Sequence, residues 1–245
     1  MIETFLALLT AHFLADFLFQ PNWMIVNKKN PLVFCLHIII IGVVAIALLG
    51  GFPIIVLLIL CGTHLIMDGI KTYILDNKSW AFCLDQSVHV IVIVGLAVVY
   101  PETFKLGCWK EVFADKIPYF YAVLCLISGL LASLPFGGAL ISKLTERFSE
   151  QLKDSTNDSG LESGGKYIGQ LERGLVMLLV MIGSPTAVGF IVAAKSILRF
   201  GDITQSGQRK RAEYVIIGTF MSFGWGLLIA VTTKSAILYY VPSSP

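Results

Sequence analysis

Three polar residues recur at every fourth position in the first apolar stretch of the chain, Ile2 to Gln20. A step of four residues returns to nearly the same face of an α-helix, so His12, Asp16 and Gln20 form one polar stripe. Imidazole and carboxylate groups in this arrangement can bind a cation or pass a proton. At membrane depth such groups are costly to bury, and they usually mark a functional site.

The same pair of residue types recurs in later apolar stretches. His64 and Asp68 are four residues apart, and Asp85 and His89 repeat this spacing in reverse order. The remaining histidine, His37, lies in the second apolar stretch, so all four histidines of the chain belong to its first four apolar stretches. This repetition predicts that the histidines and aspartates face one shared site.

The composition indicates which elements must position these residues. Of 245 residues, 56% are hydrophobic and 14% are charged, and the mean hydropathy is +0.80. These values are too apolar for a soluble domain and are typical of a polytopic membrane protein. The net charge of +2 gives no indication of nucleic-acid binding. We expect an all-α integral membrane protein that retains its first helix, with the lipid bilayer as its surroundings and no nucleic-acid partner.

Glycines, prolines and polar loops delimit the expected helices, which are 2–20, 32–49, 54–75, 81–100, 118–134, 168–182, 186–200 and about 213–229. The region Tyr167–Phe200 is too long for one crossing, because roughly 20 residues span the hydrocarbon. Gly183-Ser184-Pro185 lies near its middle. We therefore expect a hairpin there and about eight transmembrane helices, or seven if the region forms one segment.

Polarity divides the chain into two halves. We expect a five-helix half at 1–141 that carries the His/Asp cluster, a polar linker at 142–166, and a three-helix half at 167–245. Lysine and arginine favour the cytoplasmic side of a membrane. Their distribution predicts an inner-membrane protein with its N-terminus outside and its 142–166 linker in the cytoplasm.

This topology brings the polar residues to one depth. The first and third helices run inward and carry their polar residues late, whereas the second and fourth run outward and carry theirs early. At 1.5 Å per residue, the group lies roughly 6–16 Å inside the cytoplasmic helix ends. Polar residues that only stabilise packing have no reason to align in this way, so the alignment favours a site.

Imidazoles and carboxylates that converge from several helices suit a divalent metal such as zinc, manganese or iron. The expected metal ligands are His12, His37, His64, Asp68 and His89, and the expected catalytic bases are Asp16 and Asp85. This set exceeds the needs of one four-coordinate ion, so it fits a dinuclear site or one ion with surplus supporting residues. Two alternatives stay open, a proton or ion relay in a transporter and a hydrogen-bonded network that fixes helix packing.

Basic residues near the cytoplasmic helix ends suit an anionic group. We expect substrate or anion binding by Lys28, Arg173, Lys195 and Arg199, with supporting roles for Gln20, Asn27 and Glu172. In the second half, a purely structural role competes equally, because lysine and arginine can reach the interface and glutamate suits a helix N-terminus. As an enzyme the protein would hydrolyse a phosphate or acyl ester on a lipid, a lipid-linked or a small-molecule substrate. As a transporter it would move a cation or proton, with Gly183-Ser184-Pro185 as the gate.

Several motifs resemble a family of uncharacterised bacterial membrane proteins, domain of unknown function 3307. The N-terminal motif is His12-x3-Asp16-Phe-x2-Gln20, followed by Lys28 and His37. The C-terminal motifs are Gly165-x2-Ile168-Gly169-x-Leu171-Glu172-Arg173, Ala193-Ala194-Lys195-Ser196-x2-Arg199-Phe200 and Glu213-Tyr214-x3-Gly218-Thr219. A looser likeness links the chain to predicted membrane-bound metal-dependent hydrolases, although their His-Arg-x-x-Thr-His run is reduced here to Thr63-His64. That likeness implies metal binding more than it implies hydrolysis.

Overall fold

A computed structural model of the chain describes residues 1–75, 79–150, 164–200 and 209–242. Within these residues the regular secondary structure is entirely helical, which confirms the expected all-α class. The chain forms two compact units, unit 1 (1–131 and 236–245) and unit 2 (132–235). Each unit is described by itself.

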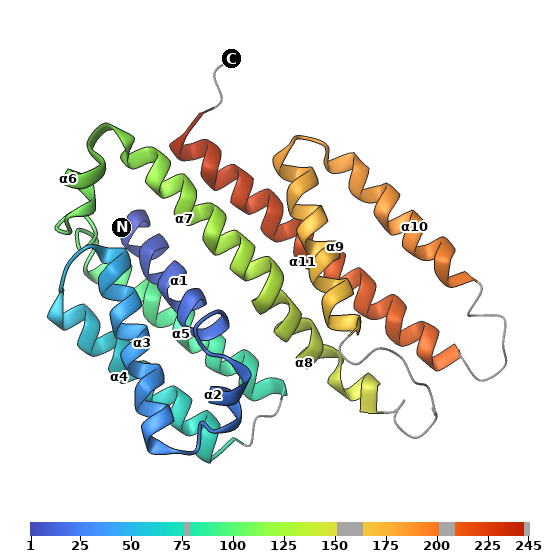
Figure 1. The fold of residues 1–245 in the computed structure, drawn as a ribbon, viewed down its shortest axis with the longest axis horizontal. Helices are drawn as coiled ribbons and strands as arrows, with labels where there is room; N and C mark the ends of the chain where they lie inside the picture. The colour runs from blue at the N-terminus through green and yellow to red at the C-terminus, as the bar shows by residue number, and fades with distance from the viewer. Residues whose placement is uncertain (76–78, 151–163, 201–208, 243–245) are drawn as a thin grey trace. The chain divides into compact units, whose positions relative to one another are not determined.

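Unit 1 is built around its first helix. Its helices are α1 (Ile2–Phe17), α2 (Asn22–Val26), α3 (Pro31–Leu49), α4 (Ile54–Tyr73), α5 (Ser79–Val99), α6 (Trp109–Phe113), η1 (Ala114–Lys116) and α7 (Ile117–Leu131). Helix α1 packs against α3, α5 and α7, and α4 packs against α3 and α5 (Figure 1). Ala7, Ala11 and Ala15 are at most 1% exposed, and these small side chains let neighbouring helices approach α1 closely.

Helix α1 ends at Phe17, three residues before the expected Gln20. The backbone N–H of Phe19 turns back to the carbonyl of Leu14 at 2.8 Å, and Pro21 disfavours helical geometry in the residue before it. Gln20 therefore lies beyond the helix, and the polar stripe on the helix itself consists of His12 and Asp16.

Local chemistry defines the ends of α3. The side chain of Asn30 accepts a hydrogen bond from the backbone N–H of Leu32 at 2.9 Å, and Pro31 occupies the first helical position, where no N–H is needed. The helix stops at Gly50, whose φ of 66° is left-handed. A Cβ atom at Gly50 would lie 2.6 Å from Trp109 Cδ1, so both the backbone and the packing require glycine there.

Five helical segments of the described chain are long and apolar enough to cross a membrane. They are Pro31–Leu49, Ile54–Tyr73, Ser79–Val99, Trp109–Ser149 and Ala212–Tyr240. Much of their apolar surface faces outward, as for Leu32 (80% exposed) and Leu58 (68%). An apolar exterior around a polar interior fits a membrane protein. Helices α1 (16 residues), α9 (18 residues) and α10 (13 residues) are shorter than these five, so the count of eight stays a prediction.

Unit 2 contains η2 (Ala132–Phe136), α8 (Gly137–Glu150), α9 (Gly164–Met181), η4 (Pro185–Ala187), α10 (Val188–Phe200) and α11 (Arg209–Tyr240), whose last residues belong to unit 1. Helix α9 ends at Met181, which makes a break between α9 and α10. Gly183 in this break has a left-handed φ of 83°, and η4 begins at Pro185. Helices α9 and α10 contact each other on either side of this break. Residues 142–150 and 164–166 of the expected linker are helical, and 151–163 lie outside the described residues.

Candidate metal centre

The four histidines and three aspartates of the expected site meet inside unit 1, on α1, α3, α4 and α5. Six of them are at most 3% exposed, and the side chain of Asp16 is 8% exposed. Consecutive helices alternate in direction, so the late residues of α1 and α4 and the early residues of α3 and α5 lie at the same end. The structure therefore brings together His12, Asp16, His37, His64, Asp68, Asp85 and His89.

Four of these side chains form a closed ring of ligand-type atoms. His37 Nε2 lies 3.4 Å from Asp16 Oδ1 and 3.3 Å from Asp68 Oδ2. His64 Nε2 lies 3.3 Å from the same oxygen of Asp16 and 3.7 Å from that of Asp68. Bonds of about 2.0–2.2 Å to a tetrahedral ion place its ligand atoms about 3.3–3.6 Å apart. The measured distances are close to this spacing, and three of the four residues, His37, His64 and Asp68, have ligand atoms that all lie within 4.8 Å of one another.

None of these contacts has the geometry of a hydrogen bond. The buried Nε2 atoms of His37, His64 and His89, together with Asp16 Oδ1 and Asp85 Oδ1, make no hydrogen bond. His37 is the extreme case, because its ring is completely buried and neither of its nitrogens has a hydrogen-bond partner. Unpaired buried polar atoms are costly, and a bound cation would satisfy those that it contacts.

A second group of ligand atoms adjoins the first. Asp85 Oδ1 lies 3.2 Å from His89 Nε2, and both belong with Asp68 to a set whose ligand atoms lie within 4.8 Å of one another. The rings of His64 and His89 stack at 3.7 Å with an interplanar angle of 5°. His12 joins a third set with Asp16 and His64, and its Nε2 contacts Gln86 Oε1 at 3.2 Å.

Two lysines pair with the aspartates at the edge of the cluster. Lys28 Nζ lies 2.7 Å from Asp68 Oδ2, and Lys71 Nζ lies 2.5 Å from Asp85 Oδ2. Three carboxylates and two ammonium groups leave the cluster with one negative charge when its imidazoles are neutral. A buried negative charge requires a positive partner. The charge balance therefore favours a bound cation or a proton.

Sequence reasoning missed Lys71 and Gln86 as members of the site. Gln86 donates from Nε2 to Asp16 Oδ2 at 3.3 Å and to Asp85 Oδ2 at 3.2 Å. Lys71 follows Asp68 by three residues and Gln86 precedes His89 by three, so both residues lie on the face that carries the cluster. Helical spacing could have identified them.

The expected supporting residues near the end of α1 have different environments. Gln20 Nε2 is buried without a hydrogen-bond partner. Asn27 is exposed, and its Nδ2 donates to the backbone carbonyl of Trp23 at 2.7 Å, which is a local turn contact.

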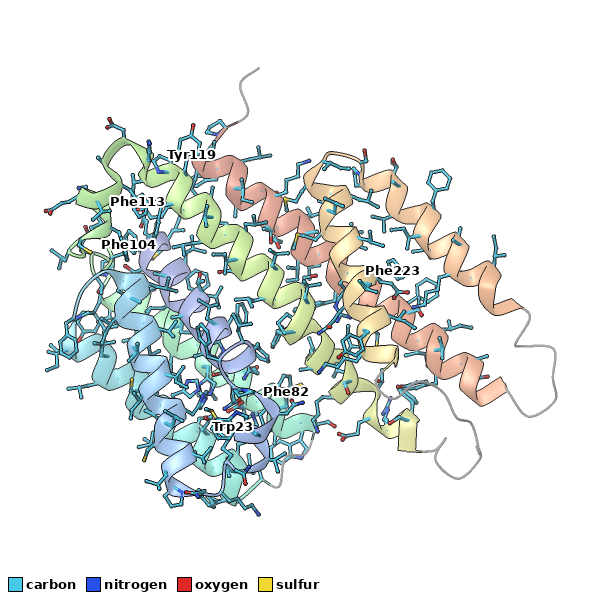
Figure 2. The ribbon with its side chains drawn as sticks, viewed as in Figure 1. Trp23, Phe82, Phe104, Phe113, Tyr119 and Phe223 are labelled. Atoms are coloured by element: carbon cyan, nitrogen blue, oxygen red, sulfur yellow. The ribbon has the colours of Figure 1, made fainter. Side chains whose placement is uncertain are left out.

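In Figure 2, Trp23 and Phe82 lie toward one end of unit 1, whereas Phe104, Phe113 and Tyr119 lie at the other end. Phe82 marks the end that carries the cluster, since Lys71 lies over its ring at 5.5 Å.

In unit 2, Arg173 and Lys195 contact other residues of the same unit. Arg173 is 3% exposed, and it donates to the carbonyls of Ser133 at 2.6 Å and Leu134 at 3.1 Å and to Ser222 Oγ at 2.8 Å. Lys195 pairs with Glu172 at 2.7 Å. The side chain of Arg199 lies outside the described part of the chain.

The comparisons with known proteins concern the part of the chain that holds the cluster. No curated protein and no solved structure matches the chain. The looser likeness to metal-dependent hydrolases thus gains no support from them. A family model described as a protein of unknown function (DUF3307) matches residues 4–116. The C-terminal motifs that resemble this family lie beyond the match. Residues 4–116, which contain all seven histidines and aspartates of the cluster, are therefore the part of the chain for which the expected DUF3307 resemblance is confirmed.

Proposed function

We propose that this chain is an integral inner-membrane protein whose His/Asp cluster is a divalent metal centre near the cytoplasmic face. The centre hydrolyses a phosphate or acyl ester on a lipid or lipid-linked substrate. The observation that carries the metal assignment is His37, which is fully buried, has no hydrogen bond at either ring nitrogen, and places its Nε2 3.4 Å from Asp16 Oδ1 and 3.3 Å from Asp68 Oδ2. A hydrogen-bonded packing network would use those nitrogens as donors or acceptors.

The donor set fits a catalytic rather than a purely structural ion. His37, His64 and Asp68 are three protein ligands, the number typical of catalytic zinc sites that leave one position for water. These three residues would hold a divalent ion, which would lower the pKa of a bound water and polarise the scissile group. Asp16 Oδ1 lies beside the two histidine nitrogens without a hydrogen-bond donor, so it can accept the proton of the attacking water. That proton then passes to the departing alcohol oxygen, so the reaction releases an alcohol and an acid.

Exposed apolar side chains in the chain segment before Lys28 support a lipid substrate. Leu18, Trp23 and Val26 are 57%, 53% and 81% exposed in the segment between α1 and Lys28. Apolar residues of this kind beside lysines suit the boundary between head groups and acyl chains. A substrate that enters there presents its polar head group to Lys28 and the cluster.

The orientation has its own test. Cys108 is exposed at the end of unit 1 opposite the cluster, and we expect it to react with a membrane-impermeant thiol reagent in intact cells. A cysteine introduced at the exposed position Ser142, with Cys108 replaced by serine, should react only after the cells are opened. The reverse pattern would place the centre on the outer side.

A proton-coupled or ion-coupled transporter is the second candidate. The ring centroids of His37 and His64 lie 5.5 Å apart, those of His64 and His89 3.7 Å, and those of His89 and His12 5.3 Å. Such a continuous row of imidazoles across α1, α3, α4 and α5 is suited to passing protons.

Metal content and transport measured on the same protein separate the two functions. We expect purified protein to contain stoichiometric zinc, manganese or iron, and Asp16→Asn to keep the metal while losing hydrolysis. Wild-type protein that is metal-free, takes up substrate in liposomes under a pH gradient and is uncoupled by Asp16→Asn would replace the hydrolase with the transporter.

A further inference from the structure

The cluster contains two sets of ligand atoms that share one carboxylate. His37, His64 and Asp68 form one set, and Asp68, Asp85 and His89 form the other. In both sets the histidine Nε2 atoms make no hydrogen bond, and in the second set the same is true of Asp85 Oδ1. A single ion bound by the first set would leave Asp85 Oδ1 and His89 Nε2 in contact only with each other, at 3.2 Å and without a hydrogen bond. A second ion bound by the second set would satisfy both atoms.

The stacked rings constrain the distance between two such ions. An ion bound to an imidazole lies close to the plane of that ring. His64 and His89 are parallel within 5° at a centroid distance of 3.7 Å, and their sets share Asp68. Parallel rings at this distance are compatible with two ions at the roughly 3.5–4 Å spacing of two-metal sites that act on phosphate groups.

The charge of the site then identifies the chemistry of its ligand. The three aspartates and two lysines carry one net negative charge, so one divalent ion gives +1 and two give +3. With two ions and a neutral acyl ester, the site would keep its net charge of +3 inside apolar helices. A dianionic phosphate would reduce that net charge to +1. Lys28 and Lys71 remain available beside the ions as additional phosphate contacts, since their side chains are 12% and 16% exposed.

We propose that the cluster holds two divalent ions bridged by Asp68 and that the group it acts on is a phosphate monoester. This inference rests on the proposed metal-dependent hydrolysis. In the reaction, the oxygen of water bonds to phosphorus and the bond between phosphorus and the alcohol oxygen breaks. One proton of the water ends on the departing alcohol oxygen, and the products are the free alcohol and inorganic phosphate.

Manganese titration of metal-depleted protein in detergent tests the two-ion centre. We expect two Mn²⁺ per chain and an electron paramagnetic resonance spectrum with exchange coupling between the ions. His89→Ala should bind one Mn²⁺ with an uncoupled spectrum, and Asp85→Asn, which preserves side-chain volume, provides the same test if His89→Ala does not fold. Cys61→Ala on α4, outside the cluster, is the matched control and should bind two. One ion, or two uncoupled ions, in the wild-type protein would overturn the inference and leave the proposed metal function intact. No bound ion would overturn both.

Phosphate probes test the ligand on the manganese-loaded protein. Inorganic phosphate should change the coupled spectrum, and nanodiscs that contain phosphatidic acid should do the same. Nanodiscs of phosphatidylcholine alone, whose phosphate is a diester, should have no effect. A response to inorganic phosphate but not to phosphatidic acid would assign the monoester to a soluble substrate. A centre that responds to neither overturns the phosphate assignment.

Discussion

Both units of the molecule bury charged side chains, but they satisfy them in different ways. In unit 1 the buried imidazoles and carboxylates converge with several ring nitrogens and carboxylate oxygens that make no hydrogen bond, and the two lysines leave a net negative charge. In unit 2 the buried Arg173 donates three hydrogen bonds to neutral oxygens. The first arrangement leaves buried polar atoms without hydrogen-bond partners, whereas Arg173 makes its hydrogen bonds to oxygens of its own unit.

The surroundings of Arg173 explain why it is complete. A Cβ atom at Gly138 would lie 3.1 Å from Nη2 of Arg173, and one at Gly169 would lie 3.1 Å from Nη1, so glycines make room for the guanidinium. Its acceptors Ser133 and Leu134 belong to the π-helical turn η2, where Pro135 interrupts the regular helical hydrogen bonds. Arg173 therefore stabilises a broken helix, and this packing favours the structural interpretation over anion binding.

The largest expected effect comes from removing His64, which belongs both to the set with His12 and Asp16 and to the set with His37 and Asp68. His64→Ala should abolish metal binding and hydrolysis, because the Nε2 of His64 contacts both Asp16 and Asp68. Elemental analysis and circular dichroism on the same sample check that metal is lost while helix is retained. Cys61→Ala, one turn away on α4, should retain the metal. If the wild-type protein contains no metal and His64→Ala loses its helical signal, the cluster has a structural role, as the contacts of Arg173 have in unit 2.

Much of the fold and of the site in unit 1 could be predicted from the sequence, for physical reasons. The apolar stretches and the four-residue His/Asp spacing are local features, so the helices α3 to α5 and the convergence of their polar faces follow from pattern and alternating direction. The early end of α1 before Pro21 depends on turn geometry. Lys71 and Gln86 share helical faces with Asp68 and His89, so their membership follows from spacing, but the partners they contact depend on tertiary distances. The contacts of Arg173 depend on the backbone carbonyls of η2, which have no periodic signature in the sequence.

The next effect distinguishes binding from chemistry within unit 1. Asp16→Asn should leave the metal content unchanged but lower the hydrolysis rate by about 10²–10⁴-fold, the usual contribution of a general base. The reason is that asparagine preserves the shape of the side chain but cannot accept the proton of water. Rates at saturating substrate, normalised to bound metal, measure this effect. Parallel loss of metal and activity would instead make Asp16 a ligand.

A change in unit 2 should affect stability alone. Arg173→Met leaves the carbonyls of Ser133 and Leu134 without their donors, and we expect a loss of roughly 2–4 kcal/mol in the free energy of unfolding. Thermal unfolding in detergent and metal analysis measure the two properties separately. Lys166→Met, an exposed position on the same helix, is the control and should change neither. If folded Arg173→Met protein binds less metal than the wild-type protein, Arg173 contributes to metal binding, and its role is not limited to the stability of unit 2.

The smallest effect compares two similar ion pairs, one from each unit. Lys71 lies 2.5 Å from Asp85, and Lys195 lies 2.7 Å from Glu172, with similar exposure of the two lysine side chains. Removing Lys71 makes the cluster more negative, so Lys71→Met should bind Mn²⁺ about 10-fold more tightly through simple Coulomb attraction. Lys195→Met removes a pair that has no part in the cluster and should leave Mn²⁺ affinity unchanged. Calorimetric titration of both variants and the wild-type protein measures the difference. A weaker affinity in Lys71→Met would mean that the lysine holds Asp85 in its ligand position, and that positioning outweighs charge at this site.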